Sequence, residues 1–365
     1  MNNLILKIKQ QIVLVICCFS FITVVAQPKE LSPNAEISVL TCGIGDEMYT
    51  LFGHTALRVK DVDQNLDVVY NWGMFDFNTP NFLGKFVKGS LLYHLGVDRY
   101  DQFIYSYTAT NRTVISQVLN LDHSQKMIIW NEINRQLHSN ERYYVYGFIQ
   151  NNCTTKVVDI LNKAYSDSLE VHFEANNHSY RYILNEGLTD NYFEKLGINL
   201  LFGYATNSKT DLIFLPIKLQ QALESDQTKI LAQKQENVVN SIKSSKLNSI
   251  YSLWFVVVLI SLFSTIKVAQ KIYFTIVSLF SFFLLTVSFF TNHPELHFNV
   301  LILFFNFITL VGILCKNKKI IYAGNFISCI SLFFIGFELL NVVFPLVFLH
   351  LVYNLMLLLP TKTKS

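Results

Sequence analysis

The sequence predicts an α+β domain with an antiparallel sheet packed on helices, followed by an all-α transmembrane domain with five helices. Two observations lead to this prediction. Short strand-like and helix-like segments alternate before residue 250, and five apolar stretches follow it, separated by short polar loops. A helix needs about 20 apolar residues to cross a bilayer, and each stretch is near that length. Charged residues make up 15% of the chain, and most of them precede residue 250.

Residues 1–26 have the pattern of a secretory signal peptide. Lys7 and Lys9 come before an apolar run at 12–26, which ends in the small residue Ala26. A basic start, a short apolar core and a small residue at the cleavage point are the parts of such a signal. An uncleaved anchor helix is the alternative, but about 15 apolar residues are few for a span. We therefore expect residues 27–249 to be exported.

The exported part is slightly acidic and shows no basic stripe. A nucleic-acid partner is therefore not expected. About 220 residues are enough to bury a hydrophobic core. We expect a catalytic domain over residues 27–217 and a polar stalk over residues 218–249, where apolar residues are sparse and Gln, Lys, Ser and Asn are frequent.

Several segments of this domain have strand patterns. Residues 54–59 and 66–72 alternate or are rich in β-branched and aromatic residues, and a polar turn separates them. Two such segments joined by a short turn predict an antiparallel hairpin. Further strands are expected at 36–41 and 111–119. Asp122 is a suitable N-cap for a helix over 123–138.

The stretch 143–161, YYVYGFIQNNCTTKVVDIL, places Cys153 at the start of a predicted amphipathic helix. A thiol there lies near free backbone N–H groups and the positive end of the helix dipole, and both favour the thiolate. Cys153 is therefore a candidate nucleophile. The backbone around Cys153 and Thr154, together with the Asn152 amide, is the expected oxyanion site. The alternative is a buried structural cysteine at a helix start.

A nucleophilic thiolate needs a base, and His54 is the best placed of the nine histidines. It begins a predicted strand directly after a glycine. A third group should orient the imidazole. Asn71 on the neighbouring strand is the candidate if the hairpin pairs as expected, and Asp76 and Glu47 are rivals.

Cys42 and Cys153 are the cysteines of the exported part. Two cysteines in an oxidising compartment form a disulfide in many proteins. A Cys42–Cys153 disulfide is therefore the main alternative to a catalytic Cys153.

Lysines in the loops between the five apolar stretches predict the orientation in the membrane. They occur only in alternate loops and at the C-terminus, which puts those loops in the cytoplasm and residue 249 outside. His293 at the outer side and His350 inside the last stretch are possible sites, because polar groups at membrane depth are often functional. The stretches are 250–266, 272–290, 297–315, 320–340 and 342–359.

Three motifs resemble a known family: GDEMYTLFGHTALRV around His54, YNWGMFDFNTPNF, which includes Asn71, and YGFIQNNCTTKVVDI around Cys153. The order of His before Cys resembles the circularly permuted papain-like group that includes lecithin:retinol acyltransferase. The motifs and the order of signal, exported domain and membrane helices are more closely similar to the lipoprotein N-acyltransferase family called Lnb. The resemblance implies a papain-like fold with His54 and Cys153 as the catalytic pair. The role of Asn71 rests on strand pairing alone.

The resemblance also implies an inner-membrane acyltransferase. An acyl chain would pass from a phospholipid, through a Cys153 thioester, to the α-amine of a diacylglyceryl-cysteine lipoprotein. No cofactor is implied, and the histidines and cysteines lack the spacing of a metal site. Two alternatives stay open. One is a membrane-tethered cysteine peptidase or amidase of the cell envelope, and the other is a non-enzymatic assembly protein with a Cys42–Cys153 disulfide.

Overall fold

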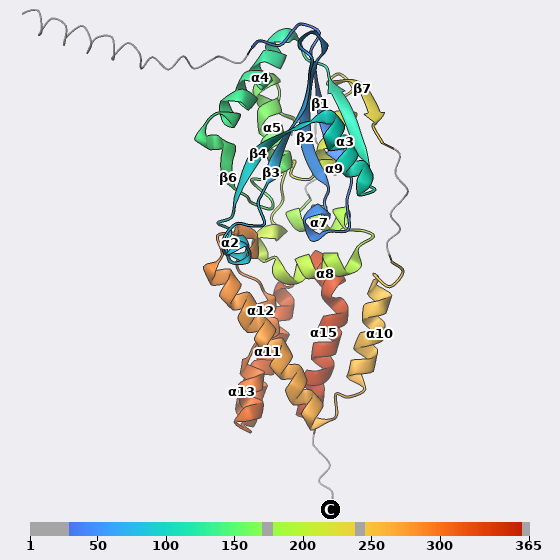
Figure 1. Ribbon diagram of the computed structural model, residues 1–365. Helices are drawn as coiled ribbons and strands as arrows, with labels where there is room; N and C mark the ends of the chain where they lie inside the picture. The colour runs from blue at the N-terminus through green and yellow to red at the C-terminus, as the bar shows by residue number, and fades with distance from the viewer. Residues whose placement is uncertain (1–28, 170–177, 238–244, 360–365) are drawn as a thin grey trace, which may run out of the picture.

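The computed structural model describes residues 29–169, 178–237 and 245–359. The predicted signal peptide, residues 1–26, lies outside the described residues. The described chain forms a mixed α+β domain with a helical region beneath it (Figure 1).

The domain is built on a seven-stranded antiparallel sheet with the order β6-β4-β3-β2-β1-β5-β7. The predicted hairpin is present, because β2 pairs with β3 and Leu57 lies opposite Tyr70. Asn65 closes the turn in the left-handed conformation, with φ 52°. The strands are β1 (Glu36–Cys42), β2 (His54–Asp61), β3 (Leu66–Met74), β4 (Leu92–Arg99), β5 (Val114–Leu119), β6 (Tyr143–Val145) and β7 (Ile230–Gln235).

Helices cover both faces of the sheet (Figure 1). On one face, α4 (His123–Leu137), α5 (Cys153–Ala164) and α9 (Pro216–Ser225) bury their apolar sides in the main core. On the other face, α3 (Tyr100–Ala109) buries Phe103 in a smaller core. Successive strand residues point to opposite faces, so Val39 joins the first core and Leu40 the second.

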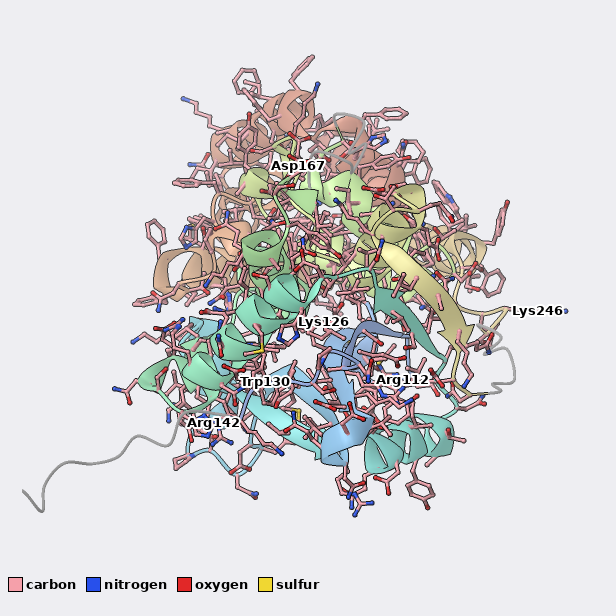
Figure 2. All side chains as sticks on the ribbon, turned by 90° about the horizontal axis from the view of Figure 1, so that it is seen from above. Arg112, Lys126, Trp130, Arg142, Asp167 and Lys246 are labelled. Atoms are coloured by element: carbon pink, nitrogen blue, oxygen red, sulfur yellow. The ribbon has the colours of Figure 1, made fainter. Side chains whose placement is uncertain are left out.

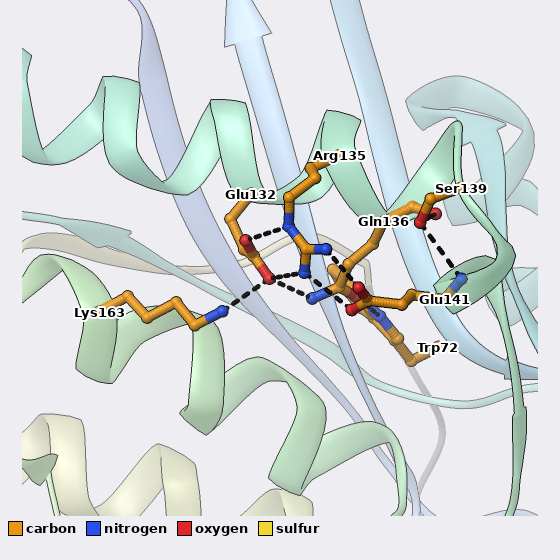
Figure 3. Close-up of polar contacts among 7 residues, drawn as sticks. All are labelled: Trp72, Glu132, Arg135, Gln136, Ser139, Glu141 and Lys163. Carbon is orange, nitrogen blue, oxygen red and sulfur yellow. Dashed lines mark hydrogen bonds and ion pairs between the residues drawn. The ribbon is translucent and has the colours of Figure 1, made fainter.

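A polar network fastens α5 to α4 and α4 to the sheet (Figure 3). Glu132 on α4 accepts hydrogen bonds from Arg135 Nη2 at 2.8 Å and from Lys163 Nζ on α5 at 2.7 Å. The Arg135 guanidinium, together with Lys163, lowers the pKa of Glu132 to about 2. Trp72 Nε1 donates to Gln136 Oε1 at 3.1 Å. The helix that carries Cys153 is thereby held against the strand that carries Asn71.

Residues 218–249 were expected to form a stalk, but much of this segment belongs to the domain. Leu219 and Leu223 of α9 lie in the main core, and β7 pairs with β5 as an edge strand. The side chains of β7 are mostly exposed, because an edge strand buries little of its surface. The polar composition of this segment is therefore compatible with the strand β7.

Short helices join the domain to the helical region. They are α2 (Phe82–Lys88), α7 (Tyr180–Gly187) and α8 (Tyr192–Leu201), and Figure 1 shows them between the sheet and the long helices. Buried Arg181 on α7 donates to Asn199 Oδ1 and Asn207 Oδ1 and to the carbonyl oxygens of Phe202 and Gly203. A buried guanidinium needs such partners to offset its lost hydration. These hydrogen bonds therefore fix α7 to the segment 199–207.

The helical region contains three helical segments long and apolar enough to cross a membrane, among the described residues: 267–290, 294–314 and 337–358. The prediction of five spanning helices was therefore wrong. At 1.5 Å per residue, the 12 residues of α10 reach about 18 Å and the 14 residues of α14 about 21 Å, against about 30 Å of hydrocarbon. The helices are α10 (Ile250–Ser261), α11 (Lys267–Phe290), α12 (Leu301–Phe304), α13 (Ile308–Leu314), α14 (Lys318–Ser331) and α15 (Phe337–Leu358).

The lysine-containing loops lie at the end of this region that faces away from the domain. The end of α11 meets α2, where the Asn292 N–H donates to the Lys88 carbonyl at 2.8 Å. The first residue of α11, Lys267, is thus at the far end. The start of α15 also meets the domain, through Glu338 and Ser179. The predicted orientation places the lysine loops and the domain on opposite sides of the membrane, and in the structure Lys267 and the domain lie at opposite ends of the helical region.

Candidate active site

Cys153 is the first residue of α5, and Asn152 caps this helix. Asn152 Oδ1 accepts hydrogen bonds from the N–H groups of Thr154 and Thr155, at 2.9 and 3.0 Å. Its Nδ2 donates to the carbonyl oxygens of Phe148 and Phe214, at 2.9 and 3.0 Å. An amide NH₂ has two hydrogens, and both are used here. Asn152 therefore shapes the helix start, and the structure does not support the expected role of its side chain as an oxyanion donor.

Cys153 is in the first turn of α5, where an α-helix leaves its backbone N–H groups without intrahelical partners. Thr154 is fully buried, and its Oγ1 lies 3.0 Å from Thr55 Oγ1 on β2. This contact joins α5 to the strand that begins with His54. The helix start and the histidine are thereby fixed relative to each other.

The position of His54 depends on Gly53, which lets the chain turn tightly into β2. Gly53 has φ +79°, and a Cβ there would lie 2.3 Å from the Cys42 carbonyl oxygen. A side chain at this position would clash with the backbone of β1. The chain can therefore turn tightly into β2 and put His54 at its first position.

A hydrogen-bonded chain of side chains leads away from His54. His54 Nε2 lies 3.1 Å from Asn71 Oδ1, and Asn71 Nδ2 donates to Asp98 Oδ2 at 2.6 Å. The amide oxygen accepts a hydrogen bond, so His54 Nε2 carries a proton. Cys153 and His54 lie close enough to shift each other's pKa, and Nδ1 is the imidazole nitrogen left to face the thiol. The order is Cys153, His54, Asn71, Asp98.

The electrostatics of the Cys153–His54 pair favour the ionised form. Burial raises the pKa of the Cys153 thiol, but the His54 charge and hydrogen bond, with hydrogen bonds from Thr55 and Thr154, outweigh burial and lower it. Burial lowers the pKa of His54, but the Cys153 charge and hydrogen bond, with Asn71, outweigh burial and raise it. A thiolate beside an imidazolium is the reactive form of a cysteine nucleophile.

Cys42 is a buried free thiol, and so is Cys153, so no disulfide joins them. Burial raises the pKa of Cys42 to about 12, which keeps this thiol protonated and unreactive. Arg112, labelled in Figure 2, lies over the Tyr107 ring at 4.6 Å and donates to the Gly43 carbonyl. The expected alternative of a Cys42–Cys153 disulfide is therefore wrong for this structure.

The rivals of Asn71 lie elsewhere. Asp76 Oδ1 accepts hydrogen bonds from the backbone and side chain of Asn78, and Glu47 precedes a short 3₁₀ helix, η1 (Met48–Thr50). Asp98 was missed from the sequence. Asp98 is on β4 and lies opposite Val69 of β3. Only the pairing of these two strands brings it to Asn71.

Aromatic side chains line the site beside Cys153. A Cβ added at Gly73 would lie 3.9 Å from Cys153 Cβ and 3.8 Å from the Tyr146 ring. Tyr146 stacks on Tyr93 with centroids 4.5 Å apart. Tyr144 Oη is buried without a hydrogen-bond partner among the described residues. The site is thus an apolar, aromatic environment around one ionised pair.

The two candidate histidines of the membrane part have different surroundings. His293 lies between α11 and α12, and its ring packs on Phe148 with centroids 4.7 Å apart. His350 on α15 lies 3.1 Å from Tyr273 Oη and 3.3 Å from Ser328 Oγ. These contacts of His350 are with α11 and α14, so it stands apart from Cys153. No group of three His, Cys, Asp or Glu side chains in the described part of the chain is arranged to hold a metal.

Asp98 offers a test of the hydrogen-bonded chain. Its carboxylate accepts from Asn71 Nδ2 and so keeps Oδ1 turned toward His54. In Asp98→Asn this strong acceptor is lost, and we expect the second-order rate of Cys153 alkylation by iodoacetamide to fall about 3- to 30-fold at pH 7. Asp101→Asn is the matched control, because its carboxylate is exposed and pairs with exposed Arg99. Equal rates in both variants would show that Asp98 does not position Asn71.

Comparison with known proteins gives one family. Residues 29–186 match the model described as the Lnb N-terminal periplasmic domain. No curated protein and no solved structure matches the chain.

Proposed function

Residues 29–186 belong to the Lnb lipoprotein N-acyltransferase family, and from this premise we propose that the protein moves an acyl chain from a phospholipid to the α-amine of a diacylglyceryl-cysteine lipoprotein. The single observation that carries the proposal is the Cys153–His54–Asn71 arrangement at the start of α5. It supplies a thiolate nucleophile, a proton donor and acceptor, and a group that orients the imidazole.

In the first half-reaction, the Cys153 thiolate attacks the ester carbonyl carbon of the phospholipid. The backbone N–H at the start of α5 stabilises the oxyanion. The carbon–oxygen ester bond breaks, and the His54 imidazolium gives its proton to the departing alkoxide. The products are a Cys153 thioester, neutral His54 and a lysophospholipid.

In the second half-reaction, the lipoprotein amine attacks the thioester carbonyl. A carbon–nitrogen bond forms and the carbon–sulfur bond breaks. Neutral His54 takes the one proton that the amine nitrogen loses as it becomes an amide, and Cys153 leaves as a thiolate. The ion pair of the resting enzyme is restored, so no cofactor is consumed.

The position of the domain suits two lipid-anchored substrates. The hydrogen bond between Asn292 and Lys88 ties α2 to the end of α11, and α11 is one of the candidate membrane helices. Leu83 and Phe77 near this junction are largely exposed. We propose that the catalytic domain, extended through β7, stands on the bilayer surface on the periplasmic side. No separate stalk is needed to hold it there.

Transfer between defined substrates tests this function. The purified full-length protein, in vesicles of a defined phospholipid, is incubated with a synthetic S-diacylglyceryl-cysteine peptide. Mass spectrometry is expected to show amide-linked acylation of the peptide N-terminus, and no product with the N-acetylated peptide. Cleavage of the peptide, with no acyl gain, would instead support a cysteine peptidase or amidase and contradict the proposal.

A further inference from the structure

Four large apolar side chains are exposed in the segments that lead into and out of the catalytic strands. Met48 and Tyr49 precede β2, Phe77 follows β3, and Leu83 is on α2; each is between 62% and 75% exposed. The Tyr49 and Phe77 rings meet edge-on with centroids 6.2 Å apart, and Phe77 lies 5.2 Å from the ring of Phe82, the residue before Leu83. These four exposed residues, which we call the apolar rim, therefore form one surface.

The apolar rim adjoins the membrane helices. Thr291 Oγ1 donates to the Val87 carbonyl oxygen of α2 at 2.9 Å, and α11, a candidate membrane helix, ends one residue earlier, at Phe290. Leu83 and Val87 are four residues apart and so lie on one face of α2. Figure 1 shows α2 between the sheet and the long helices. The Leu83 side of the rim therefore lies where a membrane-spanning α11 reaches the surface of the bilayer.

The chemistry of the rim fits a lipid surface. A contiguous exposed apolar patch marks an interaction site, and tyrosine, which the rim contains, is enriched where proteins meet the membrane surface. Lys85 and Lys88 lie in the last turn of α2. Basic residues beside an apolar face are typical of helices that lie on anionic membranes.

A row of aromatic rings connects the rim to the nucleophile. Phe77 lies 4.8 Å from Phe75, Phe75 lies 5.1 Å from Tyr93, and Tyr93 stacks on Tyr146 at 4.5 Å, measured between ring centroids. The Tyr146 ring and Cys153 border the same glycine. An acyl chain that enters at the rim therefore meets aromatic rings along this side of the site as far as the thiol.

The geometry points to the apolar rim as a lipid-docking surface, which enters the periplasmic leaflet and holds the acyl chains of the donor phospholipid. This inference rests on the proposed function and deepens it, because it names where the donor leaves the bilayer. The esters of a phospholipid lie between its acyl chains and its headgroup. A rim within the acyl layer thus lets an ester reach Cys153 without exposing the chain to water.

Leu83→Asp tests the docking surface. The full-length variant is incubated with vesicles of phosphatidylethanolamine and phosphatidylglycerol, and the acyl adduct on Cys153 is timed by intact mass. We expect adduct formation at least about 10-fold slower than in the wild type, the effect of one leucine side chain that no longer leaves water. Val62→Asp is the matched control, because Val62 is 73% exposed against 71% for Leu83 and lies in the turn between β2 and β3.

A short-chain soluble ester separates docking from the fold of the site. Acylation of Cys153 by p-nitrophenyl butyrate releases p-nitrophenolate and needs the thiolate but no leaflet. The ratio of the vesicle rate to the ester rate should fall at least about 10-fold in Leu83→Asp. In Val62→Asp the ratio should stay within about 2-fold of wild type. Equal slowing with both donors in Leu83→Asp would overturn the inference, because it would show that Leu83 supports the fold of the site.

Photocrosslinking identifies the occupant directly. A benzophenone amino acid is placed at position 83 of the full-length protein, in the same vesicles with the diacylglyceryl-cysteine peptide present. Illumination should add the mass of a phospholipid, whereas the same group at position 62 should add none. Crosslinking of position 83 to the peptide alone would assign the rim to the acceptor and overturn the inference.

The outcomes distinguish this inference from the proposed function. If the wild-type protein forms no adduct on Cys153 from vesicles, the proposed function fails. If the wild type forms the adduct and Leu83→Asp forms it equally fast, the inference alone is wrong.

Discussion

Cys153→Ala is expected to abolish N-acylation of lipoproteins. In cells whose own N-acyltransferase has been removed, the wild-type chain should yield lipoproteins with three acyl chains. The variant should yield only two, because the thioester cannot form without the sulfur. We expect a loss of at least about 10⁴-fold in transfer rate, since removal of a nucleophile leaves only the contribution of binding and oxyanion contacts. Mass spectrometry of lipoprotein N-termini measures this.

Cys42→Ala is the matched control for the loss of a thiol. Cys42 is a buried free thiol in β1 whose pKa is raised by burial. Its replacement should cost about 1–2 kcal/mol of stability through a small cavity, but leave transfer within about 3-fold of wild type. Three acyl chains on lipoproteins in cells carrying Cys153→Ala would remove Cys153 from the mechanism.

His54→Ala has the second largest expected effect, a loss of about 10³-fold in acylation rate. The thiol then loses the neighbouring positive charge that lowers its pKa, while burial continues to raise it. The pKa of Cys153 should therefore rise above its ordinary value. Alkylation of Cys153 by iodoacetamide should become at least about 10-fold slower at pH 7 and recover as the pH increases.

The wild-type acylation rate should be bell-shaped in pH. On the acid side the rate falls as Cys153, whose pKa is lowered, becomes protonated. On the alkaline side it falls as His54, whose pKa is raised, loses the proton needed by the leaving alkoxide. In His54→Ala the alkaline limb should disappear. His94→Gln, on β4 beside Tyr143, is the control that should keep both limbs, and a bell-shaped profile in His54→Ala would exclude His54 as the proton donor.

The local parts of the site could be predicted from the sequence. The start of α5 at Cys153 follows from the helical spacing of Val157 and Leu161, and the β2–β3 hairpin follows from one short turn. Both are short-range patterns. Asn71 was placed beside His54 by pairing adjacent strands, and the two side chains are in hydrogen-bond contact.

The long-range parts could not be predicted. Asp98 reaches Asn71 only through the pairing of β3 with β4. The strand β7 was missed because an edge strand does not need an apolar face. The number of spanning helices was overestimated because apolar composition does not show where a helix ends, as in α10 and α14.

An acyl chain on Cys153 should be visible in the intact mass of the full-length protein after incubation with phospholipid vesicles and no acceptor. We predict one added acyl group, released by hydroxylamine as a thioester is, mapped to the peptide that contains Cys153 and absent in Cys153→Ala. An unchanged mass, or an adduct that persists in Cys153→Ala, would contradict it.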